Sequence, residues 1–112
     1  MDYKISGKVI RGDGYGRKIG FPTVNLDYGT QELPKAGVYA GTGVLDGKEY
    51  KAGIVVGPDN KLEAHLIGYD GDAYGKEVTL KINKFIREFK KFGTEKELIA
   101  QIKEDLKLCS QA

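Results

Sequence analysis

The sequence has few of the residues that cross-link small proteins or bind metals in them. Its 112 residues include one cysteine, Cys109, and one histidine, His65. A single cysteine cannot form an internal disulfide, and one Cys with one His is too small a set for a zinc centre. We therefore expect the fold to rest on a hydrophobic core, which a chain of this length is large enough to build.

Net charge and long apolar runs are also scarce. Eighteen Lys and Arg against sixteen Asp and Glu leave a formal net charge of +2. This is too little to drive the chain onto nucleic acid or anionic lipid. There is no run of about 18 apolar residues and no apolar N-terminal segment of the secretory kind. We therefore expect a monomeric cytoplasmic protein with no membrane or nucleic-acid partner.

Glycine is in excess, with sixteen residues, all but one of them before Phe92. Glycines between short β-rich runs indicate tight turns and sharply bent strands, as in a small barrel. Alternating apolar residues predict strands that begin at Tyr3 or span roughly 38–44, 50–56, 62–67 and 78–86. Asp46-Gly47 is the strongest hairpin signal, because a type I′ turn needs positive φ at both central positions.

The apolar period changes to that of a helix in the last twenty residues. Thr94 is a good N-cap, and Glu97 completes a capping box. Apolar residues follow at helical spacing at Leu98, Ile99, Ile102 and Leu106. An isolated helix of this length is marginal in water, so we expect its apolar stripe to pack on the barrel. The predicted fold is mainly β, with five or six antiparallel strands and one C-terminal helix in a single domain, 1–112.

A cationic glycine loop follows the first strand, from Arg11 to Gly20. It does not match the P-loop pattern, and it fails the dinucleotide pattern because Arg17 stands where the last glycine belongs. Gly12 and Gly14 leave backbone N–H groups accessible to phosphate oxygens, and Arg17 and Lys18 would neutralise phosphate charge. From this run alone, a solvated turn is the alternative interpretation.

The segment after the loop reads Phe21-Pro-Thr-Val-Asn25. Pro22 fixes its own φ and favours an extended chain, so Thr23 and Asn25 lie on the same face. A hydroxyl and an amide carbonyl are hard neutral oxygens, which suit a partly hydrated Mg²⁺ whose other ligands are ATP phosphates. Thr and Asn are ordinary turn residues elsewhere, so the pair indicates a metal site only because the cationic loop precedes it.

Several further stretches appear in a fixed order along the chain. They are Gly7-Lys-Val-Ile-Arg-Gly-Asp-Gly-Tyr-Gly-Arg, Gly20-Phe-Pro-Thr-Val-Asn-Leu, Gly37-Val-Tyr-Ala, Leu62-Glu-Ala-His-Leu, Tyr74-Gly and Phe85-Ile-Arg through Lys91-Phe92. Together they resemble the riboflavin kinase (flavokinase) family over nearly the whole chain, and Pro-Thr-x-Asn is the most specific element. The resemblance implies a six-stranded Greek-key barrel. It also implies transfer of the ATP γ-phosphate to the ribityl 5′-hydroxyl of riboflavin, giving FMN and ADP.

The resemblance also implies roles for individual residues. Mg²⁺, with Zn²⁺ or Mn²⁺ as open alternatives, would be held by Thr23 and Asn25. The active-site carboxylate would be Glu63. Contacts to ATP would come from Gly12, Gly14, Arg17, Lys18, Leu66 and Tyr74. Contacts to the flavin would come from Arg87, Lys90, Phe92 and Glu97.

Physical chemistry supports the role of Glu63 separately. A carboxylate that accepts the proton of a sugar-alcohol hydroxyl makes that hydroxyl a better nucleophile toward phosphorus. Glu63 stands in an otherwise apolar strand, so we expect it to be partly desolvated. On sequence pattern alone, a solvent-facing strand glutamate is the alternative. His65 shares the face of Glu63, and we expect a structural role for it.

Two departures from the family pattern leave alternatives open. The run 54–61 is abbreviated and lacks a second Pro-Thr, so a flavin- or FMN-binding module without catalysis is an alternative. Lysines interleaved with phenylalanines over 84–92 leave a single-stranded nucleic-acid binder as a weaker one. The chain starts directly at the kinase-like segment, so we do not expect it to make FAD by itself.

Overall fold

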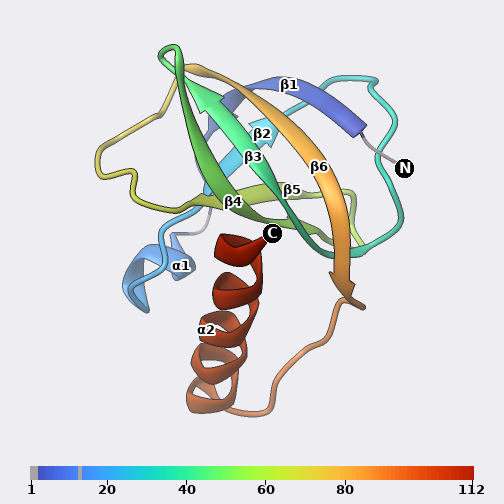
Figure 1. The fold of residues 1–112 in the computed structure, drawn as a ribbon, viewed down its shortest axis with the longest axis vertical. Coiled ribbons are helices and arrows are strands. Elements are labelled where there is room, and N and C mark those ends of the chain that lie inside the picture. Colours follow the sequence, from blue (N-terminus) through green and yellow to red (C-terminus); the bar gives the residue numbers. More distant parts are fainter. Residues whose placement is uncertain (1–2, 13) are drawn as a thin grey trace.

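The computed structural model describes residues 3–12 and 14–112. Its elements are β1 (Tyr3–Ile10), α1 (Tyr15–Lys18), β2 (Val24–Asp27), β3 (Gly37–Leu45), β4 (Lys48–Val56), β5 (Leu62–Leu66), β6 (Glu77–Arg87) and α2 (Glu95–Gln111) (Figure 1). The strands close into an antiparallel barrel in the order β1-β2-β5-β4-β3-β6. Strand β6 returns to lie beside β3, as in a Greek key. The predicted barrel class is confirmed, with six strands.

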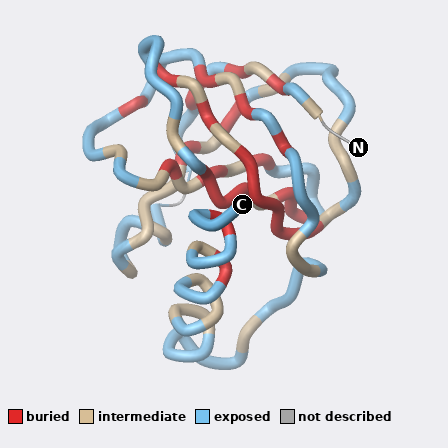
Figure 2. Tube along the Cα trace, in the orientation of Figure 1, coloured by how far each residue is buried: buried red, intermediate tan, exposed pale blue. Residues whose placement is uncertain are grey.

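The barrel interior is filled by alternate side chains of the strands. In β5, Leu62, Ala64 and Leu66 are buried, whereas Glu63 and His65 are half-buried on the outer face, as the alternation predicts. The largest fully enclosed side chains come from β1, β3, β4, β5 and β6 and are Ile5, Leu45, Ile54, Leu62, Leu80, Ile82 and Val78. The core is therefore continuous around the barrel (Figure 2).

The predicted hairpin joins β3 to β4. Asp46 has φ 52° and Gly47 has φ 76°, the two positive values that a type I′ turn requires. The ladder then runs from Leu45 opposite Lys48 to Gly37 opposite Val56. At the end of the hairpin away from the turn, β3 and β4 lie under α2, where the main cleft lies.

Helix α2 begins as predicted, because the Thr94 hydroxyl accepts a 3.1 Å hydrogen bond from the Glu97 backbone N–H. Only its C-terminal half packs on the barrel (Figures 1 and 2). There Leu106 lies so close to β4 that a Cβ on Gly53 would meet its Cδ2 at 2.9 Å. Leu98 and Ile102 are only half-buried. The prediction that the whole stripe packs on the barrel is therefore wrong for the first two turns, which stand away and form a wall.

Two local features differ from the sequence expectation or extend it. The glycine loop contains one helical turn, α1, which starts after Gly14 at φ 73°; four residues are too few to show a helical period. The abbreviated run between β4 and β5 is a tight turn, in which Gly57 N–H donates to the Lys61 carbonyl at 2.9 Å. In the described part of the chain, no helix has the length and apolar character needed to cross a membrane.

Candidate active site

The centre of the site is set by the pairing of β2 with β5. Asn25 lies directly opposite Glu63, and Val24 lies opposite Ala64. Val24 and Ala64 point into the core, so Asn25 and Glu63 share the outer face, where directly opposed Cβ atoms are about 4.5–5.5 Å apart. Continuing the same register by one residue places Thr23 opposite His65. The two predicted metal ligands and the predicted carboxylate therefore meet on one patch of the barrel.

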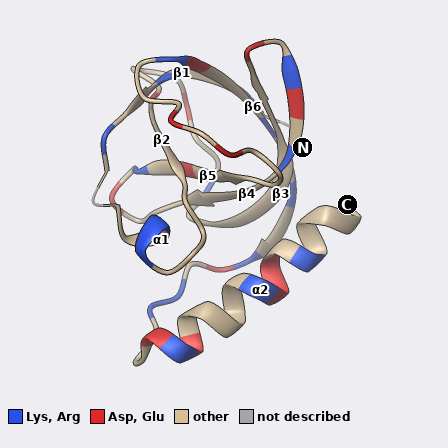
Figure 3. Cartoon of the chain, turned by 90° about the vertical axis from the view of Figure 1, so that its left-hand side faces the viewer, with Lys and Arg blue, Asp and Glu red and all other residues tan. Residues whose placement is uncertain are grey.

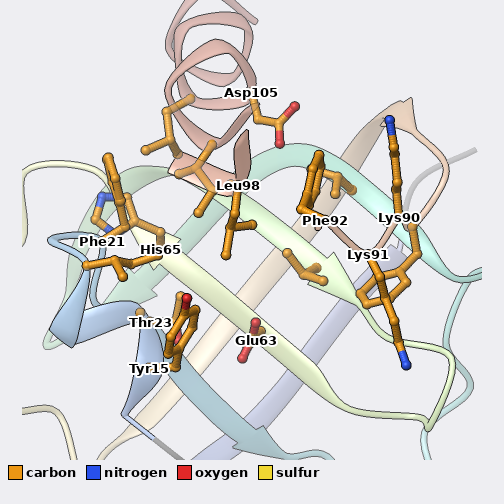
Figure 4. Close-up of a pocket in the computed structure, with 18 of the residues that line it drawn as sticks. Tyr15, Phe21, Thr23, Glu63, His65, Lys90, Lys91, Phe92, Leu98 and Asp105 are labelled. Atoms are coloured by element: carbon orange, nitrogen blue, oxygen red, sulfur yellow. The ribbon is translucent and has the colours of Figure 1, made fainter. Parts of the chain in front are cut away.

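A cleft of about 630 Å³ opens beside this patch, between the barrel and α2 (Figure 4). Its floor continues the row of outward residues from Glu63 to Val55, then Val38, then Arg87, each opposite the next on neighbouring strands. The apolar part of its lining comes from the α1 region, the loop after β6, and α2, and includes Ile19, Phe21, Phe89, Phe92, Leu98, Ile102 and Leu106. A cleft of this size and character suits a planar, largely apolar ring system.

An ion pair between the half-buried Arg87 and the buried Asp105 fixes the helix wall to the floor of this cleft. Arg87 donates from Nε to both carboxylate oxygens of Asp105, at 3.0 and 3.1 Å, and from Nη2 to Oδ2 at 2.8 Å. The Asp105 side chain is 7% exposed, and it also accepts a 2.9 Å hydrogen bond from Gln101. The Arg87 guanidinium lies 5.6 Å from the Phe92 ring centre. Arg87 therefore ties β6, α2 and the intervening loop together.

A second, more polar cleft of about 180 Å³ lies under the glycine loop. Of the predicted nucleotide contacts, it brings together Gly12, Gly14, Arg17, Leu66 and Tyr74. Lys18 is exposed on α1 and is not among the described residues that line this cleft. The basic residues of α1, Arg17 and Lys18, belong to the glycine loop (Figure 3). In the described part of the chain, the charged residues that line this cleft are two cations, Arg11 and Arg17, and two carboxylates, Asp70 and Asp72.

An aromatic–cation contact also borders this second cleft. The guanidinium of Arg11 lies 4.1 Å from the centre of the Tyr74 ring, within the range of a cation–π interaction. Arg11 was not predicted as a site residue. An exposed arginine at a strand end carries no distinctive sequence signal.

The two clefts meet at Thr23 and Gly16, which line both of them. A third hollow, of about 540 Å³, reaches the same centre from the side of the β4–β5 turn and is lined by Gly12, Asn25 and Glu63 among others. Ligands in the first two clefts would therefore approach each other at the patch that carries the carboxylate.

The Thr23–Asn25 pair fits a hard divalent cation. A Cβ at Gly12 would overlap the Asn25 side-chain amide, so the glycine leaves the amide its place at the loop. Within residues 3–12 and 14–112, no group of three or more His, Cys, Asp and Glu is arranged to hold a metal. The hydroxyl and amide oxygens would therefore share the cation with water and with oxygens of a bound ligand, which is the usual arrangement for Mg²⁺ with phosphates.

The predicted flavin contacts are not all placed alike. Arg87, Lys90 and Phe92 line the large cleft, whereas Glu97 is exposed at the helix start, where its carboxylate accepts a 3.2 Å hydrogen bond from Thr94. Asp105 was missed by the sequence analysis. Its signal was an acidic residue three positions after Ile102, on the apolar stripe of the helix.

Comparison with known proteins identifies the family. A family model described as riboflavin kinase (flavokinase) matches residues 1–112. The bifunctional riboflavin kinase/FMN adenylyltransferase of Escherichia coli (strain K12) is 37% identical over 111 residues, which cover 92% of this chain and 36% of that relative. This chain therefore spans about a third of the length of the curated relative it matches.

Two solved structures have the same fold. A crystal structure described as a macrolide-efflux protein from Streptococcus pneumoniae aligns with a TM-score of 0.90 and 28% identity, covering 97% of this chain and 38% of that one. Riboflavin kinase from Trypanosoma brucei aligns with a TM-score of 0.77 and 21% identity, covering 98% of this chain and 76% of that one. The family model matches residues 1–112, and on that basis this chain belongs to the riboflavin kinase family.

Proposed function

We propose that this chain is a riboflavin kinase that transfers the γ-phosphate of ATP to the ribityl 5′-hydroxyl of riboflavin, giving FMN and ADP. The observation that carries the proposal is the register of β2 and β5, which sets Asn25 opposite Glu63. Family membership supports the reaction class. The meeting of an apolar cleft with a polar one that contains the glycine loop and Arg17 supports the pairing of a flavin with a nucleotide.

Each cleft takes one substrate in this proposal. The isoalloxazine ring lies in the apolar cleft between the barrel floor and α2, with Phe92 and Lys90 beside it. The triphosphate lies under the glycine loop, where backbone N–H groups and Arg17 offset its charge. The ribityl chain then runs toward Thr23, which lines both clefts.

Glu63 acts as the general base. Its carboxylate accepts the proton of the 5′-hydroxyl while the hydroxyl oxygen forms a bond to the γ-phosphorus, and the bond from that phosphorus to the bridging oxygen of ADP breaks. The half-buried outer face of β5 limits the water that competes for the carboxylate. Thr23 and Asn25 would hold Mg²⁺, which when bound neutralises charge on the triphosphate.

The decisive experiment is a product assay. The protein is incubated with riboflavin, ATP and Mg²⁺, and flavins are separated by chromatography. The proposal predicts FMN and ADP in equal amounts, whereas a flavin-binding module without catalysis would bind riboflavin and yield no FMN.

Glu63→Gln tests the base. We expect it to bind both substrates but to lose about 10²–10⁴-fold in kcat. Glu77→Gln, at an exposed position of β6, is the matched control and should leave kcat unchanged. Nearly full activity of Glu63→Gln would show that another group, or no group, takes the proton.

Thr23→Val tests the metal position with little change of shape. We expect a higher KM for Mg·ATP and a smaller change in the affinity for riboflavin, because Thr23 lines both clefts. Thr30→Val, at an exposed loop position, is the control. A Mg²⁺ dependence of Thr23→Val that matches the parent protein would contradict the assignment.

The finer proposals concern the metal, the assembly and the cell compartment. We infer Mg²⁺ as the working ion, which a comparison of activity with Mg²⁺, Mn²⁺ and Zn²⁺ would test. A monomer without a nucleic-acid partner is the proposed state, and light scattering and oligonucleotide titration would test it. Since ATP and riboflavin are available in the cytoplasm, we place the reaction there, which cell fractionation would check.

A further inference from the structure

His65 makes a contact that the proposed reaction does not use. Its ring Nδ1 lies 2.7 Å from the backbone carbonyl oxygen of Pro22. A carbonyl oxygen only accepts hydrogen bonds, so Nδ1 must carry the proton and donate it. In the neutral ring this leaves Nε2 without a proton. The geometry therefore fixes one tautomer of the only histidine in the chain.

The hydrogen bond lies where the strand pairing ends. The β2–β5 register covers only Val24 with Ala64 and Asn25 with Glu63. Pro22 has no N–H with which to extend the ladder. The His65 side chain thus supplies the next cross-strand hydrogen bond, from β5 to the chain just before β2. The ring of Phe21 also packs edge-on against His65, with ring centres 6.1 Å apart (Figure 4).

The Pro22 carbonyl is rigidly connected to Thr23. The carbonyl carbon and oxygen of Pro22 and the nitrogen of Thr23 belong to one planar peptide unit. Holding the carbonyl therefore limits rotation of that unit and sets the direction from which the Thr23 side chain leaves the backbone. Thr23 lines both clefts, so its direction matters to a ligand at their junction.

We propose that His65 is a positioning residue: its Nδ1–H holds the Pro22–Thr23 peptide so that the Thr23 hydroxyl faces the metal–triphosphate at the junction. This inference rests on the proposed function, because it takes Mg·ATP as the ligand that the Thr23 hydroxyl contacts. The proposal gives the two outward side chains of β5 different roles. Glu63 takes part in the proton transfer, and His65 supports binding of the metal–nucleotide. His65 itself lines the large cleft beside Phe21, so replacing it can change the affinity for riboflavin, but that change should not follow the presence of the bond to Pro22.

Two amide side chains distinguish this role from simple packing. The Nδ2 of Asn can stand near the place of the histidine Nδ1, whereas the Nε2 of Gln stands near the place of the histidine Nε2. We expect His65→Asn to keep the bond to Pro22, and His65→Gln and His65→Leu to lose it. Calorimetry with Mg·ATP and, separately, with riboflavin measures both affinities without requiring turnover.

The expected result is a loss of about tenfold in Mg·ATP affinity for His65→Leu and His65→Gln, the scale of one net hydrogen bond. His65→Asn should stay within about twofold of the parent in Mg·ATP affinity. Because His65 lines the large cleft, riboflavin affinity can change in every variant, but it should be equal in the Asn and Gln variants. Equal losses of Mg·ATP affinity in the Asn and Gln variants would overturn the proposal, as would a riboflavin affinity that falls in step with the Mg·ATP affinity across the variants, because either result indicates a general packing defect.

The tautomer is tested without any substrate. Since the chain has a single histidine, long-range proton–nitrogen spectra at a pH where the ring is neutral report on His65 alone. A proton on Nδ1 supports the proposal, and a proton on Nε2 overturns it. If the parent protein makes no FMN while Nδ1 is protonated and the calorimetry behaves as expected, the proposed reaction fails and the positioning role stands.

Discussion

Removal of the Asp105 carboxylate should loosen the helix wall of the large cleft. Asp105→Leu leaves Arg87 without the partner to which its Nε and Nη2 donate. Removing one member of a fully buried pair costs about 3–5 kcal/mol of the free energy of unfolding. The Arg87 side chain is 22% exposed against 7% for Asp105, so water can partly solvate the remaining guanidinium. We therefore expect a loss of about 2–3 kcal/mol.

Thermal unfolding followed by circular dichroism measures this loss. A domain near this size loses about 4–8 °C in Tm per kcal/mol, so Tm should fall by about 10–20 °C. Glu104→Leu, which removes an exposed acid one position earlier, is the control and should shift Tm little. The double variant Arg87→Met/Asp105→Leu should regain most of the stability, because replacing both partners by apolar groups leaves no buried charge.

The same variant should affect the two substrates differently. Asp105 and Arg87 line the large cleft, and neither lines the cleft under the glycine loop. Riboflavin affinity should therefore fall more than Mg·ATP affinity, measured below the new Tm. The reasoning would be refuted if Asp105→Leu unfolded within about 2 °C of the parent, or if the double variant were no more stable than the single one.

Two other positions give independent tests. Gly12→Ala should displace the Asn25 amide, which the new Cβ would overlap, and should therefore raise KM for Mg·ATP. Gly93→Ala is the control, because a Cβ there meets nothing nearer than 4.0 Å. Equal kinetics in both variants would contradict the role of Asn25. Burial raises the pKa of the Cys109 thiol from 9.0 to about 11, so the unfolded chain releases this proton first as pH rises. The free energy of unfolding should therefore fall between about pH 9 and 11 by more in the parent than in Cys109→Ala. Urea midpoints of unfolding that change equally with pH in the two proteins would show that the thiol does not contribute.

The sequence was most informative where local chemistry decides structure. Alternation placed Glu63 and His65 on the outer face of β5. The Asp46-Gly47 pair marked the β3–β4 hairpin, and Thr94 marked the start of α2. These signals depend on neighbours in the chain, so a single sequence carries them.

Long-range pairing was not readable in the same way. Nothing near Asn25 or Glu63 in the sequence states that β2 pairs with β5 in this register. Similarly, an acidic residue on the apolar stripe of α2 marks Asp105 as unusual, but nothing near it in the sequence identifies Arg87 as its partner. The family resemblance divided the predicted site residues between ATP and flavin contacts, but the two clefts and their meeting at Thr23 and Gly16 needed the folded chain.

The central claim is that Glu63 takes the proton from the acceptor hydroxyl beside the metal-bound triphosphate. A crystal structure with riboflavin, Mg²⁺ and a non-hydrolysable ATP analogue tests it most directly. We predict a hydrogen bond of about 2.6–3.2 Å between the Glu63 carboxylate and the 5′-oxygen, with Thr23 and Asn25 oxygens on the cation. A Glu63 side chain turned away from the hydroxyl, or a triphosphate bound outside the cleft under the glycine loop, would contradict the account.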